Sequence, residues 1–176
     1  MDAETAGLVS SLREQLDRLT ALVRTLLEMS NLQSVSRTDQ IALAPLVEEI
    51  LTDLTSLAQK NNISLQQDCA ELGMVGSDAL IYRLVFNLVE NGIKYNRPGG
   101  AVRVTLRQEK QTAVLHVADT GPGIPADCRD SIFQPFFRVD KSRSREMGGV
   151  GLGLALVREI AVLHGGGVTV ESSSEN

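Results

Sequence analysis

Three polar, glycine-bearing segments constrain this chain more than any other feature. Asn87 to Asn91 lies within a stretch of helical periodicity, and residues 119–125 (Asp-Thr-Gly-Pro-Gly-Ile-Pro) directly follow the alternating apolar run 112–118. Residues 148–154 (Gly-Gly-Val-Gly-Leu-Gly-Leu) lead into another helical stretch. Because a helix edge, a turn after a strand and a glycine-rich helix start can face one another, these segments predict a common pocket.

The composition bounds the class of protein. The chain has 176 residues and no Trp, so we expect one globular domain with an extra helical element and a mainly aliphatic core. The net charge of -5 argues against general nucleic-acid binding. Cys69 and Cys128 lack metal-ligand spacing and are expected to be reduced thiols. No apolar run approaches about 18 residues, so we expect no membrane segment in this chain.

Residues 3–33 predict a long amphipathic helix. They contain no Pro and only one Gly. Apolar residues recur at every third or fourth position, which is typical of a helix with one apolar stripe: Leu8, Leu12, Leu16, Leu19, Val23, Leu26 and Leu27. A lone helix cannot bury such a stripe by itself, so we expect a partner helix from a second chain and hence a homodimer.

The rest of the chain predicts an α+β fold with several helices on one face of a sheet. Residues 33–44 are expected to form a linker with a short extended segment. The patterns predict further helices over 45–60, 77–95 and 151–163. They predict strands over 63–65, 102–106, 114–117 and 168–171. Ser77 is the expected N-cap of its helix.

Asn87, Asn91 and Lys94 share one edge of the helix predicted over 77–95. At about 100° per residue they fall within about 60° of one another. Amide oxygens suit Mg²⁺, which keeps its other positions for water and phosphate, and an ammonium group suits a phosphate. Taken alone, the three residues also fit a solvated helix face.

Asp119 lies where a strand ends, and its carboxylate can accept a hydrogen bond from an exocyclic amine such as that of adenine. Gly121 and Gly123 allow the backbone to approach a flat ligand. Asp and Gly are also common in turns, so this segment alone fits an ordinary polar turn.

The glycines of residues 149–153 precede a helix whose free N–H groups and dipole make its start an anion site. No Gly-Lys-Ser/Thr follows, which excludes a Walker loop, and no strand leads directly into the segment, which excludes a Rossmann fingerprint. The basic residues just upstream form a segment near the expected phosphates, or else a solvated loop: Arg138, Lys141, Arg143 and Arg145. Together the three segments predict a pocket for a purine nucleotide and its phosphates.

In order and spacing, the chain resembles the ATP-binding catalytic domain of sensor histidine kinases, which has the Bergerat fold. Residues 87–95 resemble the N box, 119–125 the G1 box, 133–140 the F box and 149–154 the G2 box. Residues 17–30 resemble the second helix of the dimerisation and phosphotransfer hairpin.

The resemblance implies two parts in this chain. Residues 1–36 would belong to the dimerisation hairpin, and residues 37–176 would form the ATP-binding domain, a two-layer α/β sandwich with a mixed sheet. Residues 172–176 end the chain where the family has a further turn and a last apolar strand, so we expect an unpaired sheet edge. Met147 and Val150 occupy lid positions that are often Thr.

The resemblance also implies that the ligand is Mg²⁺ with ATP or ADP. Asn91 would hold Mg²⁺ with Asn87 beside it, Lys94 would reach a phosphate, Tyr95 would pack on the adenine, and Asp119 would bond its amine. Pocket glycines, neighbouring apolar residues and lid arginines complete the implied contacts: Gly121, Gly123, Ile124, Arg138, Arg143, Arg145, Gly149, Gly151, Leu152 and Gly153. The residues implied to be catalytic act by positioning and neutralising the γ-phosphate: Asn87, Asn91, Lys94 and Arg138.

Asn87 distinguishes subfamilies of this fold. Related gyrase-type ATPases and anti-sigma serine kinases usually carry a Glu four residues before the Mg²⁺-binding Asn, and that Glu activates water or a hydroxyl. With Asn87 in its place the pocket has no general base, and Glu90 is expected to point elsewhere. The resemblance therefore favours transfer of the γ-phosphoryl group to a histidine over hydrolysis.

The acceptor histidine of the family is absent. The only two histidines are His116, within a strand pattern, and His164, at a helix end where a cation complements the dipole. The resemblance thus implies a fragment whose acceptor lies outside this chain, with relay to an Asp of a response regulator. It further implies an upstream sensor region and a bacterial membrane protein of which this is a cytoplasmic portion. The alternatives are a non-catalytic nucleotide-binding or dimerisation module and a gyrase-type ATPase.

Overall fold

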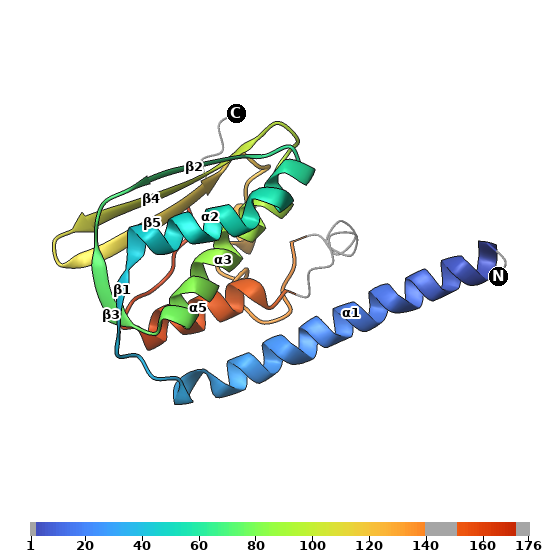
Figure 1. The fold of residues 1–176 in the computed structure, drawn as a ribbon, viewed down its shortest axis with the longest axis horizontal. Helices are drawn as coiled ribbons and strands as arrows, with labels where there is room; N and C mark the ends of the chain where they lie inside the picture. Colours follow the sequence, from blue (N-terminus) through green and yellow to red (C-terminus); the bar gives the residue numbers. More distant parts are fainter. Residues whose placement is uncertain (1–2, 140–150, 172–176) are drawn as a thin grey trace.

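The computed structural model describes residues 3–139 and 151–171. Helix α1 (Ala3–Asn31) extends away from a two-layer body in which helices cover a sheet (Figure 1). The long N-terminal helix predicted from the leucine spacing is therefore confirmed. No helix in the described ranges is both long enough and apolar enough to cross a membrane.

The sheet layer combines parallel and antiparallel pairing. Strand β2 (Ser64–Cys69) pairs in parallel with β4 (Ala101–Glu109), and β4 pairs antiparallel with β5 (Thr112–Asp119). Strands β1 (Asp39–Ala42) and β3 (Gly73–Gly76) form a separate antiparallel ribbon. The strands predicted over 102–106 and 114–117 are thus confirmed as parts of β4 and β5. Strand β3 was not predicted because so short a strand with a glycine at each end has no alternating apolar pattern.

Three helices pack on the same side of the β2–β4–β5 sheet: α2 (Leu43–Lys60), α3 (Asp78–Lys94) and α5 (Gly153–Leu163) (Figure 1). Short 3-10 helices span Leu32–Ser34 (η1) and Ala126–Cys128 (η2). The core between the layers is aliphatic, as predicted. Its fully buried side chains include Ile50, Val89, Ile93, Val102, Val104, Leu106, Leu156 and Ile160.

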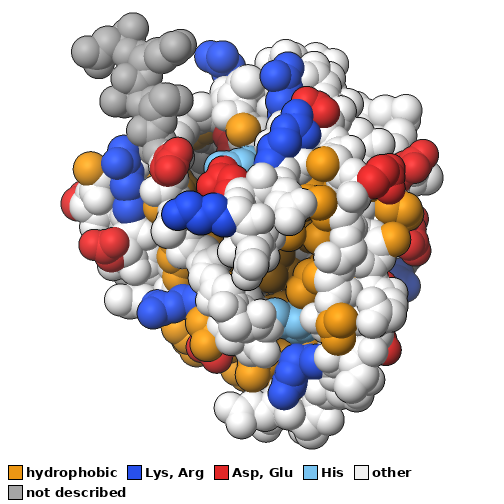
Figure 2. Space-filling view, turned by 90° about the vertical axis from the view of Figure 1, so that its left-hand side faces the viewer, with side chains coloured by type: hydrophobic (Ala, Val, Ile, Leu, Met, Phe, Trp, Pro, Cys, Tyr) orange, Lys and Arg blue, Asp and Glu red, His pale blue; other side chains and the backbone are white. Residues whose placement is uncertain are grey.

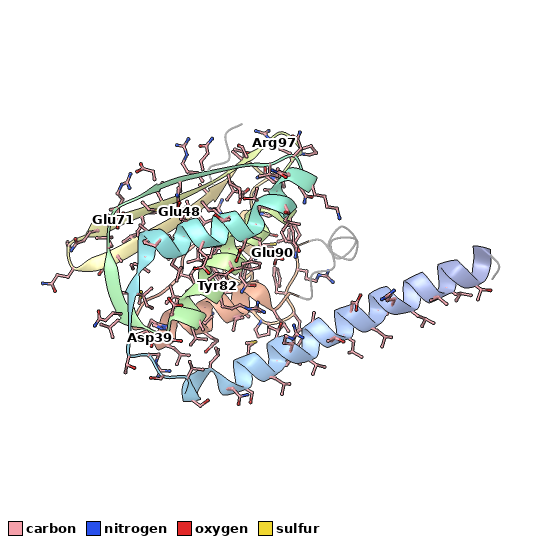
Figure 3. All side chains as sticks on the ribbon, viewed as in Figure 1. Asp39, Glu48, Glu71, Tyr82, Glu90 and Arg97 are labelled. Carbon is pink, nitrogen blue, oxygen red and sulfur yellow. The ribbon has the colours of Figure 1, made fainter. Side chains whose placement is uncertain are left out.

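Tyr82 joins α3 to α2. Its hydroxyl donates a hydrogen bond to Asp53 Oδ2 at 2.5 Å. This bond, together with desolvation, raises the pKa of Tyr82 to about 12. The Tyr82 ring also stacks on Phe86 of the same helix, with ring centroids 5.9 Å apart, and Figure 3 labels Tyr82 on α3.

The strand predicted over 168–171 is wrong, because these residues pair with no described strand. The alternation that suggested it is real, since Val168 and Val170 are half-buried while Thr169 is exposed. A strand also needs a hydrogen-bonded neighbour, which an alternating pattern cannot guarantee. Conversely, β2 extends well beyond the predicted 63–65, because its polar residues 66–68 pair with β4.

Candidate functional site

Gly92 brings the last turn of α3 onto the sheet. A Cβ at this position would lie 3.2 Å from Val102 Cγ2 and 3.6 Å from Asp119 Cβ. Any side chain would therefore press against a core valine and move the helix away from the end of β5. The absence of a side chain at Gly92 places the Asn-bearing helix beside Asp119.

A buried amide joins the end of α3 to the turn that contains Asp119. Asn96 is 6% exposed, and its Nδ2 donates to the carbonyl oxygens of Gly92 and Ala101, both at 3.0 Å. Its Oδ1 accepts from the Arg97 N–H at 2.9 Å and from the Thr120 hydroxyl at 3.1 Å. The Thr120 oxygen in turn accepts from the Ala101 N–H at 2.9 Å. Asn96 and Thr120 were not among the predicted site residues, although they hold the turn in place.

The carboxylate of Asp119 has one fixed oxygen and one available oxygen. Oδ1 accepts the Gly121 N–H at 2.8 Å, and no described residue bonds Oδ2. A Cβ at Gly121 would lie 2.7 Å from Asp119 Oδ1 and 2.9 Å from the carbonyl oxygen of Tyr95, so only glycine fits there. Gly123 has φ of 73°, which favours glycine as well, and Ile124 after it is half-buried.

The structure brings Asn87, Asn91 and the start of α5 together. A Cβ at Gly153 would lie 3.1 Å from Asn87 Oδ1 and 3.9 Å from Asn91 Nδ2. The Nδ2 of Asn87 donates to the Arg83 carbonyl oxygen at 2.7 Å, which leaves its Oδ1 facing α5. Two half-buried amides thus border the helix start that was predicted to bind phosphate.

Lys94 is paired with Glu90. Its Nζ lies 2.8 Å from Glu90 Oε1, and the two side chains are 29% and 27% exposed. Such a pair is expected one helical turn apart on the surface of a helix, and Figure 3 labels Glu90 on α3. Lys94 therefore needs to exchange or share this partner to reach a phosphate.

Tyr95 and Arg138 lie within electrostatic reach of each other. Burial raises the pKa of the Tyr95 hydroxyl, the positive charge of Arg138 opposes this shift, and Glu90 adds to it. The Nε and Nη2 atoms of Arg138 are buried and have no hydrogen-bond partner among the described residues. A partly buried guanidinium with two unpartnered nitrogens suits an anionic ligand, because an unpaired buried donor is costly.

Gly151, just before α5, is hydrogen-bonded to the F-box segment over residues 133–140. Its carbonyl oxygen accepts the Phe136 N–H at 2.8 Å. Leu152 is 2% exposed, so its side chain belongs to the core and only its backbone can meet a ligand. Arg143, Arg145 and Gly149, which were predicted to contact the nucleotide, lie outside the described residues.

Replacing Gly151 with Ala is expected to lower the free energy of unfolding by about 1–3 kcal/mol. Gly151 has φ of 79°, and a Cβ there would lie 2.7 Å from the Phe137 carbonyl oxygen. Urea unfolding followed by circular dichroism measures the loss. The matched control is Gly167→Ala, because a Cβ at Gly167 meets nothing within 4 Å. Equal losses in the two variants would contradict this reading of the Gly151 turn.

Comparison with known proteins identifies the family. Residues 76–176 match the family described as histidine kinase-, DNA gyrase B- and HSP90-like ATPases. The match covers more than half of the chain, so the chain belongs to this family. The family resemblance stated from the four motifs is therefore confirmed.

The curated relatives are sensor kinases. The sensor histidine kinase RppB of a Synechocystis species is 37% identical over 175 residues, which cover 97% of this chain and 38% of RppB. The sensor-like histidine kinase SenX3 of Mycolicibacterium smegmatis is 35% identical over 160 residues, which cover 88% of this chain and 41% of SenX3. The chain thus spans about two fifths of the length of these relatives.

Solved structures confirm the fold class. A mycobacterial sensor histidine kinase, MprB, superposes with a TM-score of 0.68 at 29% identity, covering 76% of this chain and 85% of that one. The histidine kinase ThkA in complex with the response regulator TrrA gives a TM-score of 0.77 at 24% identity, covering 99% of this chain and 49% of that one. ShkA in complex with AMPPNP gives 0.75 at 24% identity, covering 98% and 38%.

Proposed function

We propose that this chain is the catalytic part of a two-component sensor histidine kinase, which binds Mg·ATP and transfers the γ-phosphoryl group to a histidine outside the chain. One observation carries the proposal. Asp119 at the end of β5, the two asparagines of α3 and Gly153 at the start of α5 border one end of α3. These groups supply an acceptor for a purine amine, oxygens for Mg²⁺ and N–H groups for phosphate.

The purine end of the pocket is formed by Asp119 and Tyr95. The free Oδ2 of Asp119 would accept the exocyclic amine of adenine, while Oδ1 stays on the Gly121 N–H. Tyr95 is 38% exposed at the end of α3, and its ring would pack on the base. Gly121 and Gly123 keep the backbone close to a flat ligand.

The phosphate end carries the positive groups. Asn87 and Asn91 would hold Mg²⁺, which would bridge phosphate oxygens and offset their charge. The buried, unpartnered nitrogens of Arg138 support a contact with phosphate, and so does the start of α5. Lys94 would join them by turning from Glu90. These groups act by positioning and electrostatics, with no covalent step on the protein side of the pocket.

The groups around Asn87 favour phosphoryl transfer over hydrolysis, because none of the described ones is placed to activate water. An amide cannot take a proton from water, and this one is held by the Arg83 carbonyl. The nearest carboxylate on the same helix, Glu90, is engaged with Lys94. Among the described residues, the phosphate end of the pocket therefore offers no general base to activate water, which supports an external imidazole as the acceptor.

The N-terminal part is assigned to dimerisation. Residues 1–36 would be the second helix of the phosphotransfer hairpin, and residues 37–176 the ATP-binding domain. The leucines of the α1 stripe are exposed, from 41% at Leu26 to 61% at Leu12 and Leu16, so they are open to a partner helix from a second copy. A response regulator would receive the phosphoryl group on an Asp, and the complete protein would carry an upstream sensor region in a bacterial membrane.

We expect no acid-labile phosphate on this chain after incubation with Mg·ATP. Its two histidines are unsuitable as acceptors, because His116 lies on the sheet and His164 is bonded through both ring nitrogens. Radiolabelled ATP followed by acid and base treatment provides the measurement. Adding a separate helix hairpin that carries the acceptor histidine should restore transfer to that hairpin. Nucleotide binding without such transfer would favour the non-catalytic module, and steady ATP turnover without an acceptor would favour the gyrase-type ATPase.

A further inference from the structure

His164, at the end of α5, bonds two different elements through its two ring nitrogens. Its Nδ1 lies 2.8 Å from the carbonyl oxygen of Ile160, one turn earlier in α5. Its Nε2 lies 3.1 Å from the backbone nitrogen of Ser77, the N-cap residue just before α3. Because a backbone N–H can only donate, Nε2 is an acceptor and Nδ1 carries the proton. The ring is therefore neutral here, rather than the helix-end cation expected from its position.

The start of α3 depends on side chains from other elements. Ser77 is the N-cap residue, as predicted, but its hydroxyl makes no capping hydrogen bond. Ser77 is 2% exposed, so its N–H cannot turn to water and its partner is the imidazole. The next N–H, that of Asp78, donates to Asp39 Oδ2 at 3.0 Å, and Figure 3 labels Asp39 at this end of the molecule.

Gly76 makes room for the imidazole. A Cβ at Gly76 would lie 2.7 Å from His164 Cδ2 and 3.0 Å from its Nε2, closer than a side chain tolerates. Figure 2 shows this β1–β3 end of the molecule, where apolar side chains gather in a hollow. The ring thus sits in a space that the glycine keeps open, and it is not a loose surface side chain.

The contact lies at one point of the interface between α3 and α5, which pack on each other along their lengths. At a second point Gly153, at the start of α5, approaches Asn87 Oδ1. At about 1.5 Å per residue, the two points are about 15 Å apart along α3 and about 16 Å apart along α5. The helices run antiparallel with matching lengths between the two points, so we expect a shift of α5 at His164 to change the distance between Gly153 and the two asparagines.

We propose that His164 is a positioning residue that, as the neutral Nδ1–H tautomer, caps α3 from α5 and so sets the alignment of the nucleotide-binding groups at their far ends. The inference rests on the proposed function for its effect on nucleotide affinity. The cap itself is a property of the protein without ligand and is tested separately.

The first test measures the hydrogen bond from the Ser77 N–H to His164 Nε2 in the nucleotide-free chain. Nitrogen-15 spectra of the imidazole should report His164 as the Nδ1–H tautomer, and the Ser77 amide should exchange slowly with solvent. In His164→Leu, which keeps an apolar side chain but has no acceptor, Ser77 exchange should accelerate by about tenfold or more. A protonated Nε2 in the wild type, or unchanged Ser77 exchange in the variant, would overturn the inference.

The second test uses nucleotide affinity to measure whether His164 aligns α3 with α5. His164→Leu should weaken binding of Mg·AMPPNP by about five- to tenfold. His164→Gln, whose amide oxygen can accept the Ser77 N–H, should restore affinity to within about threefold of the wild type. A folded Leu variant with wild-type affinity, or a Gln variant no better than Leu, would overturn the positioning role. If the wild type binds no nucleotide, the proposed function fails, while the Ser77 and tautomer readings still decide whether the cap exists.

Discussion

Asp119→Asn is expected to weaken the binding of ATP by about 30- to 150-fold, which corresponds to about 2–3 kcal/mol. The substitution is nearly isosteric, and the amide oxygen of Asn can still accept the Gly121 N–H that Oδ1 accepts now. Its amide nitrogen would then occupy the place of Oδ2. An N–H donor would face the amine donor of the adenine, so a hydrogen bond is replaced by an unfavourable contact.

Calorimetric titration of the folded variant with Mg·ATP measures this effect. The matched control is Asp127→Asn in η2, which removes the same charge from an exposed position that is not among the predicted ligand contacts. We expect the control to bind as the wild type does and both variants to unfold at the same denaturant concentration. Equal affinity of Asp119→Asn and the wild type would show that the Asp119 carboxylate makes no hydrogen bond to the adenine amine.

The second large effect is expected from Asn96→Ala, which should lower the free energy of unfolding by about 3 kcal/mol. The buried amide makes four hydrogen bonds, and its removal leaves the Gly92 and Ala101 carbonyls and the Thr120 hydroxyl short of a partner. Because these groups connect α3 to the Asp119 turn, nucleotide affinity should fall as well. Denaturant unfolding and calorimetry together measure both consequences.

A double-mutant cycle that combines Asn96→Ala with Thr120→Val tests whether Asn96 and Thr120 stabilise the protein through their shared hydrogen bond. Thr120→Val alone removes one bond to Asn96 and one to Ala101, so a smaller loss of about 1 kcal/mol is expected. The two losses should not add, since the residues share a hydrogen bond. Additive losses would mean that Asn96 stabilises α3 independently of the turn.

The sequence predicted which residues gather at the end of α3 better than it predicted the residues that hold them in place. Asp119, Asn87, Asn91 and Gly153 stand in recognisable motifs, because residues that meet a nucleotide must be of particular types at particular spacings. The structure brings these residues to one end of α3. Their roles toward Mg²⁺ and ATP remain predictions that the experiments above address.

The supporting residues carry no comparable signal. Gly92 is required by the distance between a helix and Val102, and Asn96 by carbonyls contributed from two elements. Such requirements arise only after the helix and sheet have packed. His164 is the same kind of case, because its position at a helix end suggested a cation, whereas its acceptor role depends on Ser77, which is distant in sequence.

Strand pairing was the least predictable part of the fold. The alternation over 168–171 is present without a described ladder, whereas β2 pairs along its polar residues. Hydrophobic patterns report which side of a segment is buried, and hydrogen-bonded neighbours are decided by the whole sheet. The Lys94–Glu90 ion pair is a similar case on a helix. The i,i+4 spacing permits the pair, but whether Lys94 stays on Glu90 or turns to a phosphate depends on the ligand that binds.

The end of α3 is expected to form a pocket for Mg·ATP. The most direct test is a calorimetric titration of the chain with AMPPNP, with and without Mg²⁺. We predict one site per chain, a clear gain in affinity when Mg²⁺ is present, and loss of the signal in Asp119→Asn. A chain that is folded by circular dichroism and gives no binding heat at several temperatures would contradict the claim.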